Sequence, residues 1–249
     1  MNNLLEIKNI TKNYHTKEGE IAAIKDFNLE IEKGQIISLV GPSGCGKSTL
    51  LTIVANLDKN YSGCILNNDD IKIAYMLQSD ALLPWLTIYE NAILGLKIQN
   101  KLTKENLEYV DYLLNFYNLI EFKNNYPKSL SGGMKQRLAL IRTLALKPDL
   151  LLLDEPFSAL DQQSRLLISD DVYKLIKKEN KTVILVTHNI EEAIIFSDKI
   201  IILSKRPALI KNIITIDISN QESIYERRKD ANFHKYFDII WKDLDINES

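Results

Sequence analysis

Residues 41–49 read Gly-Pro-Ser-Gly-Cys-Gly-Lys-Ser-Thr and contain the whole Gly-x-x-x-x-Gly-Lys-Ser/Thr pattern of phosphate-binding loops. They follow an apolar run at 35–40 that predicts a buried strand, and a helix is expected to begin near Lys47. Glycine lets the backbone aim its N–H groups at phosphate oxygens, and a helix N-terminus adds positive potential. A glycine-rich turn could match by chance, but three of the nine glycines fall here in the right order. The run therefore predicts a site for nucleotide phosphates.

The residues of this loop have distinct expected roles. Lys47 is expected to reach the β- and γ-phosphates, and the Ser48 hydroxyl to ligate Mg²⁺. The positive environment also predicts a reactive thiol at Cys45 if that side chain reaches solvent; the alternative is that Cys45 points inward as a small apolar side chain. The predicted nucleotide-binding residues of the loop are Gly41, Pro42, Ser43, Gly44, Cys45, Gly46, Lys47, Ser48 and Thr49.

A second candidate element is the run Leu-Leu-Leu-Leu-Asp-Glu at 150–155. Such an apolar run is typical of a central parallel strand buried on both faces. Ligands of α/β sheets bind at the carboxyl ends of the strands, where this run places Asp154 and Glu155. Taken alone, the two acids could form a helix cap or a solvated strand end. With the phosphate loop they predict hydrolysis, in which Asp154 holds Mg²⁺ and Glu155 is the general base for water.

Strand-like and helix-like segments alternate along the chain, which predicts an α/β fold with a parallel sheet covered on both faces. The β-rich opening predicts an antiparallel β flank, and the helical stretch at about 85–147 predicts an inserted subdomain. We expect strands at 4–10, 21–31, 35–40, 72–77, 150–153, 182–187 and 199–203. We expect helices beginning at 47 and covering 105–116, 134–146, 164–178 and 190–196.

Composition limits the possible partners. The 249 residues are 45% hydrophobic and 26% charged, which is ordinary for a globular protein with a substantial core. The net charge of −2 gives no overall basic field, so nucleic acid is not an expected partner. Cys45 and Cys64 lack metal-ligand spacing and are expected to be reduced thiols. There is no signal-peptide pattern and no spanning-length apolar run, so any membrane-spanning part is expected from a partner.

Five further motifs resemble those of ATP-binding-cassette ATPases. The run 130–137, Leu-Ser-Gly-Gly-Met-Lys-Gln-Arg, resembles the signature of that family and lies between the phosphate loop and the acids. The resemblance covers residues 4 to about 205, with the motifs in the family's order, and implies a P-loop fold that binds and hydrolyses ATP with Mg²⁺. The other four matches are Gln78 (Q-loop), Ser158–Asp161 (D-loop), His188 (switch histidine) and Tyr14 (adenine-stacking aromatic).

The resemblance implies a site shared between two subunits. Ser131, Gly132 and Gly133 would begin a helix whose N–H groups face the γ-phosphate of ATP held by the other subunit; without the family they read as a helix cap. Asp161 would brace the dimer contact. His188 and Gln78 are implied as catalytic residues, together with Glu155. Gln78 would also serve the metal and contact the transporter, His188 would contact the γ-phosphate, and Tyr14 would stack on adenine. Without the family resemblance, the alternative interpretations are that His188 has a structural role and that Tyr14 is an aromatic residue on the face of a sheet.

Three features are similar to importer subunits of the nitrate, sulfonate and taurine group: the run 83–91, Asp-Glu-Pro-Phe at 154–157, and Gly-Gly-Met in the signature. This similarity implies an ATPase at the cytoplasmic face of a membrane, docked on transmembrane permease subunits near 78–91. The other implied partners are a second nucleotide-binding subunit, expected to form a homodimer with this chain, and, indirectly, a substrate-binding protein. The alternatives are a soluble cassette ATPase in DNA repair or translation, which usually has two cassettes, and a P-loop kinase or GTPase, which offers no reason for Leu-Ser-Gly-Gly.

Two departures from the family pattern stand out, and the tail completes the expected domain. Met134 replaces the usual glutamine, and the segment 62–77 is short, which predicts a trimmed β-hairpin near the nucleotide. The expected organisation is one nucleotide-binding domain over 1–249, with the helical subdomain at about 85–147 and a tail at about 215–249. The apolar spacing of 227–244 predicts an amphipathic helix packed on the domain; a regulatory role is the alternative.

Overall fold

The computed structural model describes residues 3–17, 19–67, 71–218 and 222–244. Within these residues six strands form the main sheet, in the order β5-β6-β7-β3-β8-β9. All neighbours are parallel except β9, which runs antiparallel to β8. The strands are β3 (Ile36–Val40), β5 (Ile73–Met76), β6 (Leu150–Asp154), β7 (Thr182–Val186), β8 (Lys199–Leu203) and β9 (Ile210–Thr215).

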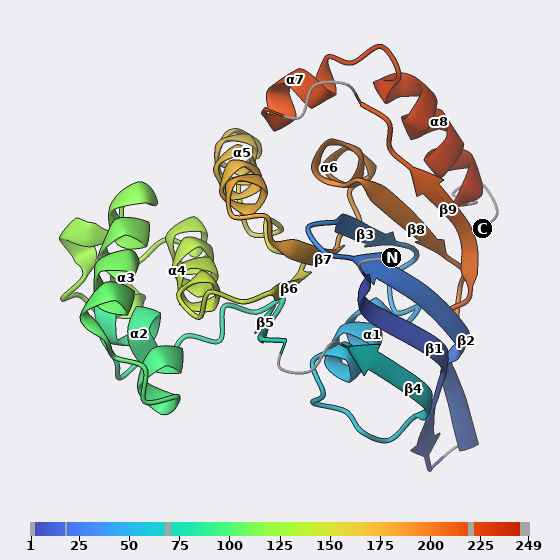
Figure 1. Ribbon diagram of the computed structural model, residues 1–249, viewed down its shortest axis with the longest axis horizontal. Coiled ribbons are helices and arrows are strands. Elements are labelled where there is room, and N and C mark those ends of the chain that lie inside the picture. The colour runs from blue at the N-terminus through green and yellow to red at the C-terminus, as the bar shows by residue number, and fades with distance from the viewer. Residues whose placement is uncertain (1–2, 18, 68–70, 219–221, 245–249) are drawn as a thin grey trace.

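The central strands are apolar because both faces of this sheet are covered. Every residue of β3, β6 and β7 is buried. Helices α5 (Gln162–Lys178) and α6 (Ile190–Phe196) cover one face of the sheet, and α1 (Lys47–Val54) covers the other (Figure 1). Alternate side chains of β6 belong to different cores: Leu151 and Leu153 to the core that contains α5 and α6, and Leu150 and Leu152 to the core that contains α1. The predicted strands of this sheet and the α/β fold class are confirmed.

A second sheet is antiparallel, with the order β2-β1-β4. Its strands β1 (Asn3–Thr16) and β2 (Gly19–Glu32) are longer than predicted because their pairing continues to Thr16 and Gly19. The edge strand β4 (Ser62–Asn67) was not predicted, since most of its residues are exposed and it lacks a clear apolar alternation. The expected short hairpin falls partly on 68–70, outside the described residues.

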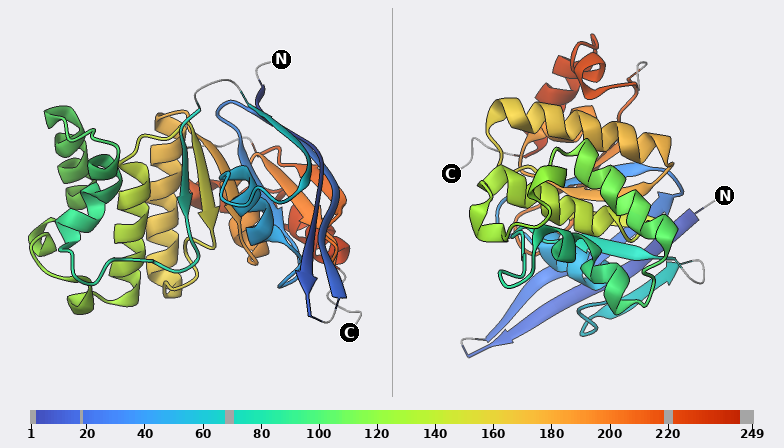
Figure 2. Two further views of the ribbon diagram at one scale, coloured as in Figure 1. Left: turned by 90° about the horizontal axis from the view of Figure 1, so that it is seen from below. Right: turned by 90° about the vertical axis from the view of Figure 1, so that its left-hand side faces the viewer.

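Helices α2 (Ile88–Ile98), α3 (Lys104–Phe116) and α4 (Gly132–Leu144) form a group at one end of the molecule, with the antiparallel sheet at the other (Figure 2). Two short 3₁₀ helices, Ile120–Phe122 and Pro127–Ser129, connect α3 to α4. Thr87, Thr103 and Ser131 cap the three helices through their side-chain hydroxyls, which explains where each begins. Their apolar faces join the core of the main sheet.

The tail forms two helices, α7 (Ile224–Arg228) and α8 (Phe233–Asp243). The amphipathic helix expected in 227–244 is present as α8 but begins only at Phe233, and α7 was not expected. The two helices bury different groups. Arg227 is fully buried and donates from Nη2 to the carbonyl oxygens of Ile194 and Ser197, above the ring of Tyr173. Phe233 and Ile240 pack α8 on the apolar core. The chain turns between them, where the Asp230 carboxylate accepts from the N–H of Asn232. Packing of the tail on the domain is as expected.

Among the described residues, no helix combines the length and the apolar character needed to cross a membrane.

Candidate nucleotide-binding site

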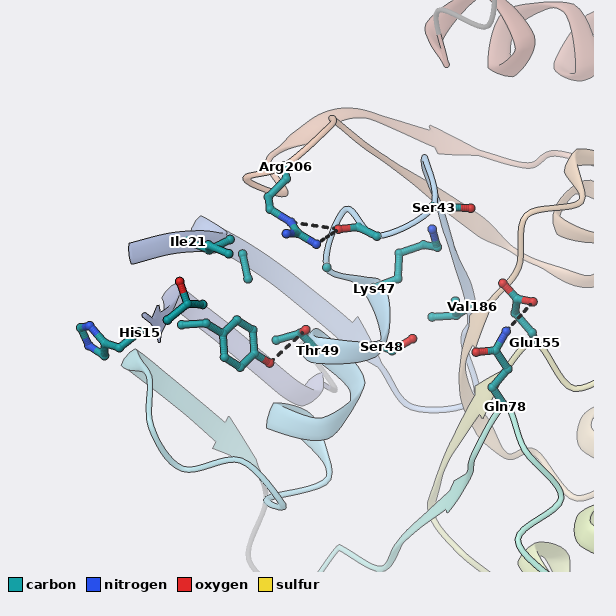
Figure 3. Close-up of a pocket in the computed structure, with 15 residues that line it drawn as sticks. His15, Ile21, Ser43, Lys47, Ser48, Thr49, Gln78, Glu155, Val186 and Arg206 are labelled. Atoms are coloured by element: carbon teal, nitrogen blue, oxygen red, sulfur yellow. Dashed lines mark hydrogen bonds between the residues drawn. The ribbon is translucent and has the colours of Figure 1, made fainter. Parts of the chain in front are cut away.

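A cavity of about 600 Å³ lies between the first turn of α1, the loop after β3, the end of β1 and the start of β2 (Figure 3). Strands β3, β5, β6 and β7 are parallel neighbours, so the loops that follow them meet at one edge of the sheet. Of the residues predicted from sequence, this cavity brings together Tyr14, Ser43, Gly44, Gly46, Lys47, Ser48, Thr49, Gln78 and Glu155.

The loop 41–46 wraps tightly around the buried ammonium group of Lys47. Lys47 Nζ donates to the carbonyl oxygens of Gly41 (2.7 Å) and Pro42 (2.9 Å). Gly46 has a φ of 128°, and a Cβ there would lie 2.8 Å from the carbonyl oxygen of Ala23, so glycine is required by both conformation and space. The first turn of α1 has no side-chain cap, which leaves its N–H groups available for an anion.

Asp154 is buried at the end of β6, where its Oδ2 accepts a hydrogen bond from the Tyr75 hydroxyl (3.3 Å). Burial raises the pKa of Asp154, while hydrogen bonds from Ser48 and Tyr75 and the charge of Lys47 oppose that rise. A carboxylate that is costly to ionise and lies beside a hydroxyl would be stabilised by a cation. Asp154 and Ser48 therefore provide the hard oxygen donors that Mg²⁺ prefers.

Glu155 lies at the centre of the other predicted catalytic groups. Its Oε2 accepts from Gln78 Nε2 (3.2 Å), and its Oε1 lies 3.2 Å from His188 Nδ1. The backbone of Glu155 has a φ of 48°, a left-handed conformation that costs a side-chain-bearing residue about 1 kcal/mol or more. Its N–H donates to the carbonyl oxygen of Val186 (2.9 Å), and its carbonyl oxygen accepts from Gln136 Nε2 (3.3 Å). These bonds hold the conformation that aims the carboxylate at the cavity.

The aromatic ring of Tyr14 lies at the mouth of the cavity. Its residue is 41% exposed, and its hydroxyl is 3.3 Å from Thr49 Oγ1 at the first turn of α1. The ammonium group of the buried Lys12 lies 4.8 Å from the ring centroid and is held by an ion pair with the half-buried Asp58 (2.8 Å). The ring is thus fixed in position while a large part of it stays accessible.

The signature residues lie elsewhere. Ser131 caps α4 by accepting from the N–H of Met134, and Asp161 caps α5 by accepting from the N–H of Ser164. A Cβ on Gly133 would come within 3.0 Å of Leu160, so the start of α4 lies against the segment 158–161. Ser131, Gly132 and Gly133 are not among the residues that line the cavity. Within one chain Ser131 therefore acts as the N-cap of α4, and Gly132 and Gly133 are the first residues of that helix.

Sequence reasoning missed three residues beside the site: Tyr75, which donates to Asp154, Arg206, which lines the cavity, and Glu192, which is buried at the first turn of α6. None belongs to a pattern that is readable along the chain. Each reaches the site only because the sheet order and the packing of α6 bring distant segments together.

The expectation of an accessible thiol at Cys45 is wrong. Cys45 is 1% exposed and packs in the apolar core under α1, with Lys47 Nζ 3.9 Å from its Sγ. The loop turns the Cys45 side chain inward as it wraps, so the alternative of a small apolar side chain holds. Cys64, in contrast, is exposed on β4.

Maleimide is therefore expected to modify Cys64 and spare Cys45. Mass spectrometry of the folded wild type should show one adduct, at Cys64, with ATPase activity retained. The Cys64→Ala variant should remain unmodified over the same time. An adduct at Cys45 that Mg-ATP slows would contradict the observed burial.

Glu192 predicts a pH-dependent stability. Burial raises its pKa to about 7, the charge of Glu155 adds to the rise, and Arg165 and a hydrogen bond from Thr187 oppose it. From its ordinary pKa of 4.5 up to about 7, the folded protein binds more protons than the unfolded chain. Stability from this group therefore falls as pH rises through that window. The free energy of unfolding of Glu192→Gln minus that of wild type should therefore increase by about 3 kcal/mol as the pH is raised from 4.5 to 8. Urea unfolding across this range measures the gain, and a difference independent of pH would contradict it.

The ABC transporter family model matches residues 24–158 of this chain. An uncharacterized ABC transporter ATP-binding protein of Bacillus subtilis, YtlC, is 44% identical to it over 251 residues, covering 98% of this chain and 96% of YtlC. The chain therefore belongs to the ABC transporter family and is an ATP-binding, ATP-hydrolysing protein.

Other similar proteins confirm the resemblance to the nitrate and sulfonate group. The nitrate import ATP-binding protein NrtD of Synechocystis is 36% identical, covering 95% of this chain and 93% of NrtD. The aliphatic sulfonates import ATP-binding protein SsuB of Bacillus cereus is 37% identical, with coverages of 90% and 93%. A dimeric ATP-binding cassette, MJ0796, solved after hydrolysis with ADP and Pi bound, superposes with a TM-score of 0.77 at 34% identity, covering 86% of this chain and 99% of that cassette.

Proposed function

We propose that this chain is the ATP-hydrolysing subunit of an importer and couples closure of two cassettes to uptake of a small anion through a membrane permease. The observation that carries the proposal is the continuity between Glu155 and the segment that begins at Gln78. Gln78 contacts Glu155 directly, and the same segment exposes Trp85, which is 68% accessible. A partner docked on this segment would sense the state of the site.

Hydrogen bonds from two helices hold the segment that follows Gln78. The buried side chain of Asn91 on α2 accepts from the N–H of Leu83 (2.9 Å) and donates to the carbonyl oxygens of Leu83, Leu86 and Thr87. Arg142 on α4 donates to the carbonyl oxygens of Asp80 and Ala81. Residues 80–87 are therefore fastened to two helices, and displacement of those helices would move the segment as a unit.

We assign the nucleotide to the cavity. Tyr14 would stack on adenine, the loop 41–49 would surround the phosphates, and Lys47 would leave its carbonyl partners for the β- and γ-phosphates. Ser48 and Asp154, with Gln78, would hold Mg²⁺, which would neutralise phosphate charge during cleavage.

Glu155 would be the base for hydrolysis. Its carboxylate would accept a proton from the attacking water as the oxygen bonds to the γ-phosphorus and the β–γ bridging bond breaks. Gln78 and His188 each contact one oxygen of the carboxylate, and these contacts would orient Glu155. His188 would then contact the γ-phosphate, and in this way couple the catalytic base to the phosphate that it helps to cleave.

A second copy of the chain would complete the site. Ser131, Gly132 and Gly133 begin a helix whose N–H groups suit a phosphate, yet they lie outside the cavity of their own chain. Pairing two copies would bring this helix to the γ-phosphate of the partner's nucleotide, with Asp161 bracing the contact. The dimeric MJ0796 cassette supports this arrangement.

The proposed assembly contains two such chains beneath transmembrane permease subunits, at the cytoplasmic face of the membrane, with a substrate-binding protein on the other side. Nitrate, a sulfonate, taurine or a related small solute is the proposed cargo, in line with the names of NrtD and SsuB. We also propose that 1–249 is one nucleotide-binding domain with a helical subdomain at about 85–147 and a tail at about 215–249.

Co-expression with a permease encoded beside the gene tests this proposal. The chain should co-purify with the permease, and nitrate or a sulfonate with its binding protein should stimulate ATPase activity in vesicles. Trp85→Ala should weaken co-purification and leave the ATPase activity of the isolated chain unchanged. Trp241→Ala, at an exposed tryptophan of α8, is the matched control. Failure of the chain to bind any such permease would favour a soluble cassette ATPase.

A further inference from the structure

The turn between β8 and β9, residues 204–209, lies beside the phosphate loop. This follows from the sheet order, because β8 is the parallel neighbour of β3 and the two strands end at the same edge. The turn is fastened to β2: the N–H of Ala208 donates to Ala23 (2.9 Å), and the N–H of Lys25 donates to Ala208 (3.2 Å). Within the turn, Ser204 Oγ donates to the carbonyl oxygen of Pro207 (2.9 Å).

The three glycines of the phosphate loop face this turn or the strand end before it. A Cβ on Gly41 would lie 3.0 Å from Leu203, one on Gly46 would lie 3.3 Å from Ala208, and one on Gly44 would lie 3.5 Å from Arg206 Nη2. The phosphate loop therefore packs against this turn.

Arg206 makes the polar contact between this turn and the loop. Its Nε and Nη2 both donate to the carbonyl oxygen of Gly44, at 3.1 and 2.7 Å, and its side chain lines the cavity (Figure 3). Gly44 has a φ of 72°, a conformation in which successive N–H groups can converge on an anion while a carbonyl points away. Because the Arg206 guanidinium holds the Gly44 carbonyl outward, it opposes rotation of the peptide unit between Gly44 and Cys45.

We propose that Arg206 is a positioning residue for nucleotide binding, which acts through Gly44 to hold the phosphate loop in its phosphate-binding conformation. The proposal rests on the proposed role of the loop as the phosphate site. Both hydrogen bonds join groups of the protein alone, so the proposed role requires that Arg206 hold the loop whether or not nucleotide is bound. Because ATP and ADP share the phosphates nearest to the loop, both should depend on Arg206 to a similar degree.

The test compares Arg206→Ala, Arg206→Lys and Lys47→Ala, with Arg228→Ala as a control that removes an exposed arginine of α7. Titration calorimetry should show ATP and ADP each binding about tenfold more weakly to Arg206→Ala, the order expected for two charge-assisted hydrogen bonds at a partly exposed site. Arg206→Lys should recover part of the loss, since one ammonium group can donate to Gly44 without the paired geometry. Arg228→Ala should bind as wild type does.

Hydrogen–deuterium exchange without nucleotide separates positioning from direct phosphate contact and from general destabilisation. Arg206→Ala should exchange faster in the peptide covering 41–50, with the β6 peptide 150–154 unchanged. Unchanged exchange in 41–50, a loss confined to ATP, or wild-type affinity for both nucleotides would overturn the role of Arg206. Should Lys47→Ala also bind nucleotide as wild type does, the proposed phosphate site itself would be wrong.

Discussion

Replacement of Glu155 by glutamine is expected to lower ATP turnover by about 10²- to 10⁴-fold, the usual contribution of a general base. The amide keeps the shape of the side chain and can still accept one hydrogen bond, but it cannot take a proton from water. ATP binding should be nearly unchanged, because Glu155 has no assigned contact with the bound phosphates. Phosphate release measures turnover, and calorimetry measures binding.

Glu191→Gln is the matched control for this change. Glu191 is a partly exposed acid on α6 that pairs with Arg228, so its variant should retain wild-type turnover. If Glu155→Gln also turned over ATP at the wild-type rate, another group would have to accept the proton, and the pairing of Glu155 with Gln78 and His188 would be structural.

Replacement of Lys47 by alanine is expected to weaken ATP binding by at least about tenfold and to lower turnover further still. The variant removes a buried point charge from the place where the β- and γ-phosphates would lie. The loss should be larger for ATP than for ADP, because the γ-phosphate is absent from ADP.

Lys47 also donates to Gly41 and Pro42, so a loosened loop could contribute to that loss. Thermal unfolding without nucleotide separates the two effects. If the variant unfolds at the wild-type temperature but binds ATP weakly, the loss of affinity comes from the missing charge. Lys178→Ala, at an exposed lysine of α5, should bind ATP as wild type does. Hydrolysis by Lys47→Ala near the wild-type rate is the result that the phosphate-loop assignment could not survive.

The features that sequence predicted well are those whose cause is local. Few structures other than a phosphate-binding loop place this glycine pattern between an apolar strand and a helix. The apolar run 150–153 is buried on both faces as a central strand. Because parallel strands end at one edge, placement of Glu155 near the loop followed from the same pattern. The assignment of Gln78 to the site came from the family resemblance, and in the structure its side chain contacts Glu155.

The features that sequence missed depend on contacts between distant segments. The break between α7 and α8 accompanies burial of Arg227 among residues of α5 and α6, which no apolar periodicity reveals. Cys45 appeared accessible because its neighbours bind an anion, yet the wrapped loop turns its side chain into the core. Arg206 reaches Gly44 across 162 positions only because β8 pairs with β3.

The most direct test of a site completed by a second copy is the mass of Glu155→Gln in solution with and without Mg-ATP, measured by light scattering during size-exclusion chromatography. The chain has a mass of 28.6 kDa. Without nucleotide the variant should be monomeric, and with Mg-ATP, which it binds but does not cleave, it should elute at twice that mass. Adding Ser131→Arg should abolish this dimer while leaving ATP binding by the monomer intact, since Ser131 is assigned to the partner's nucleotide. A monomeric Glu155→Gln at saturating Mg-ATP, or loss of monomer binding in the Ser131→Arg variant, would contradict the composite site.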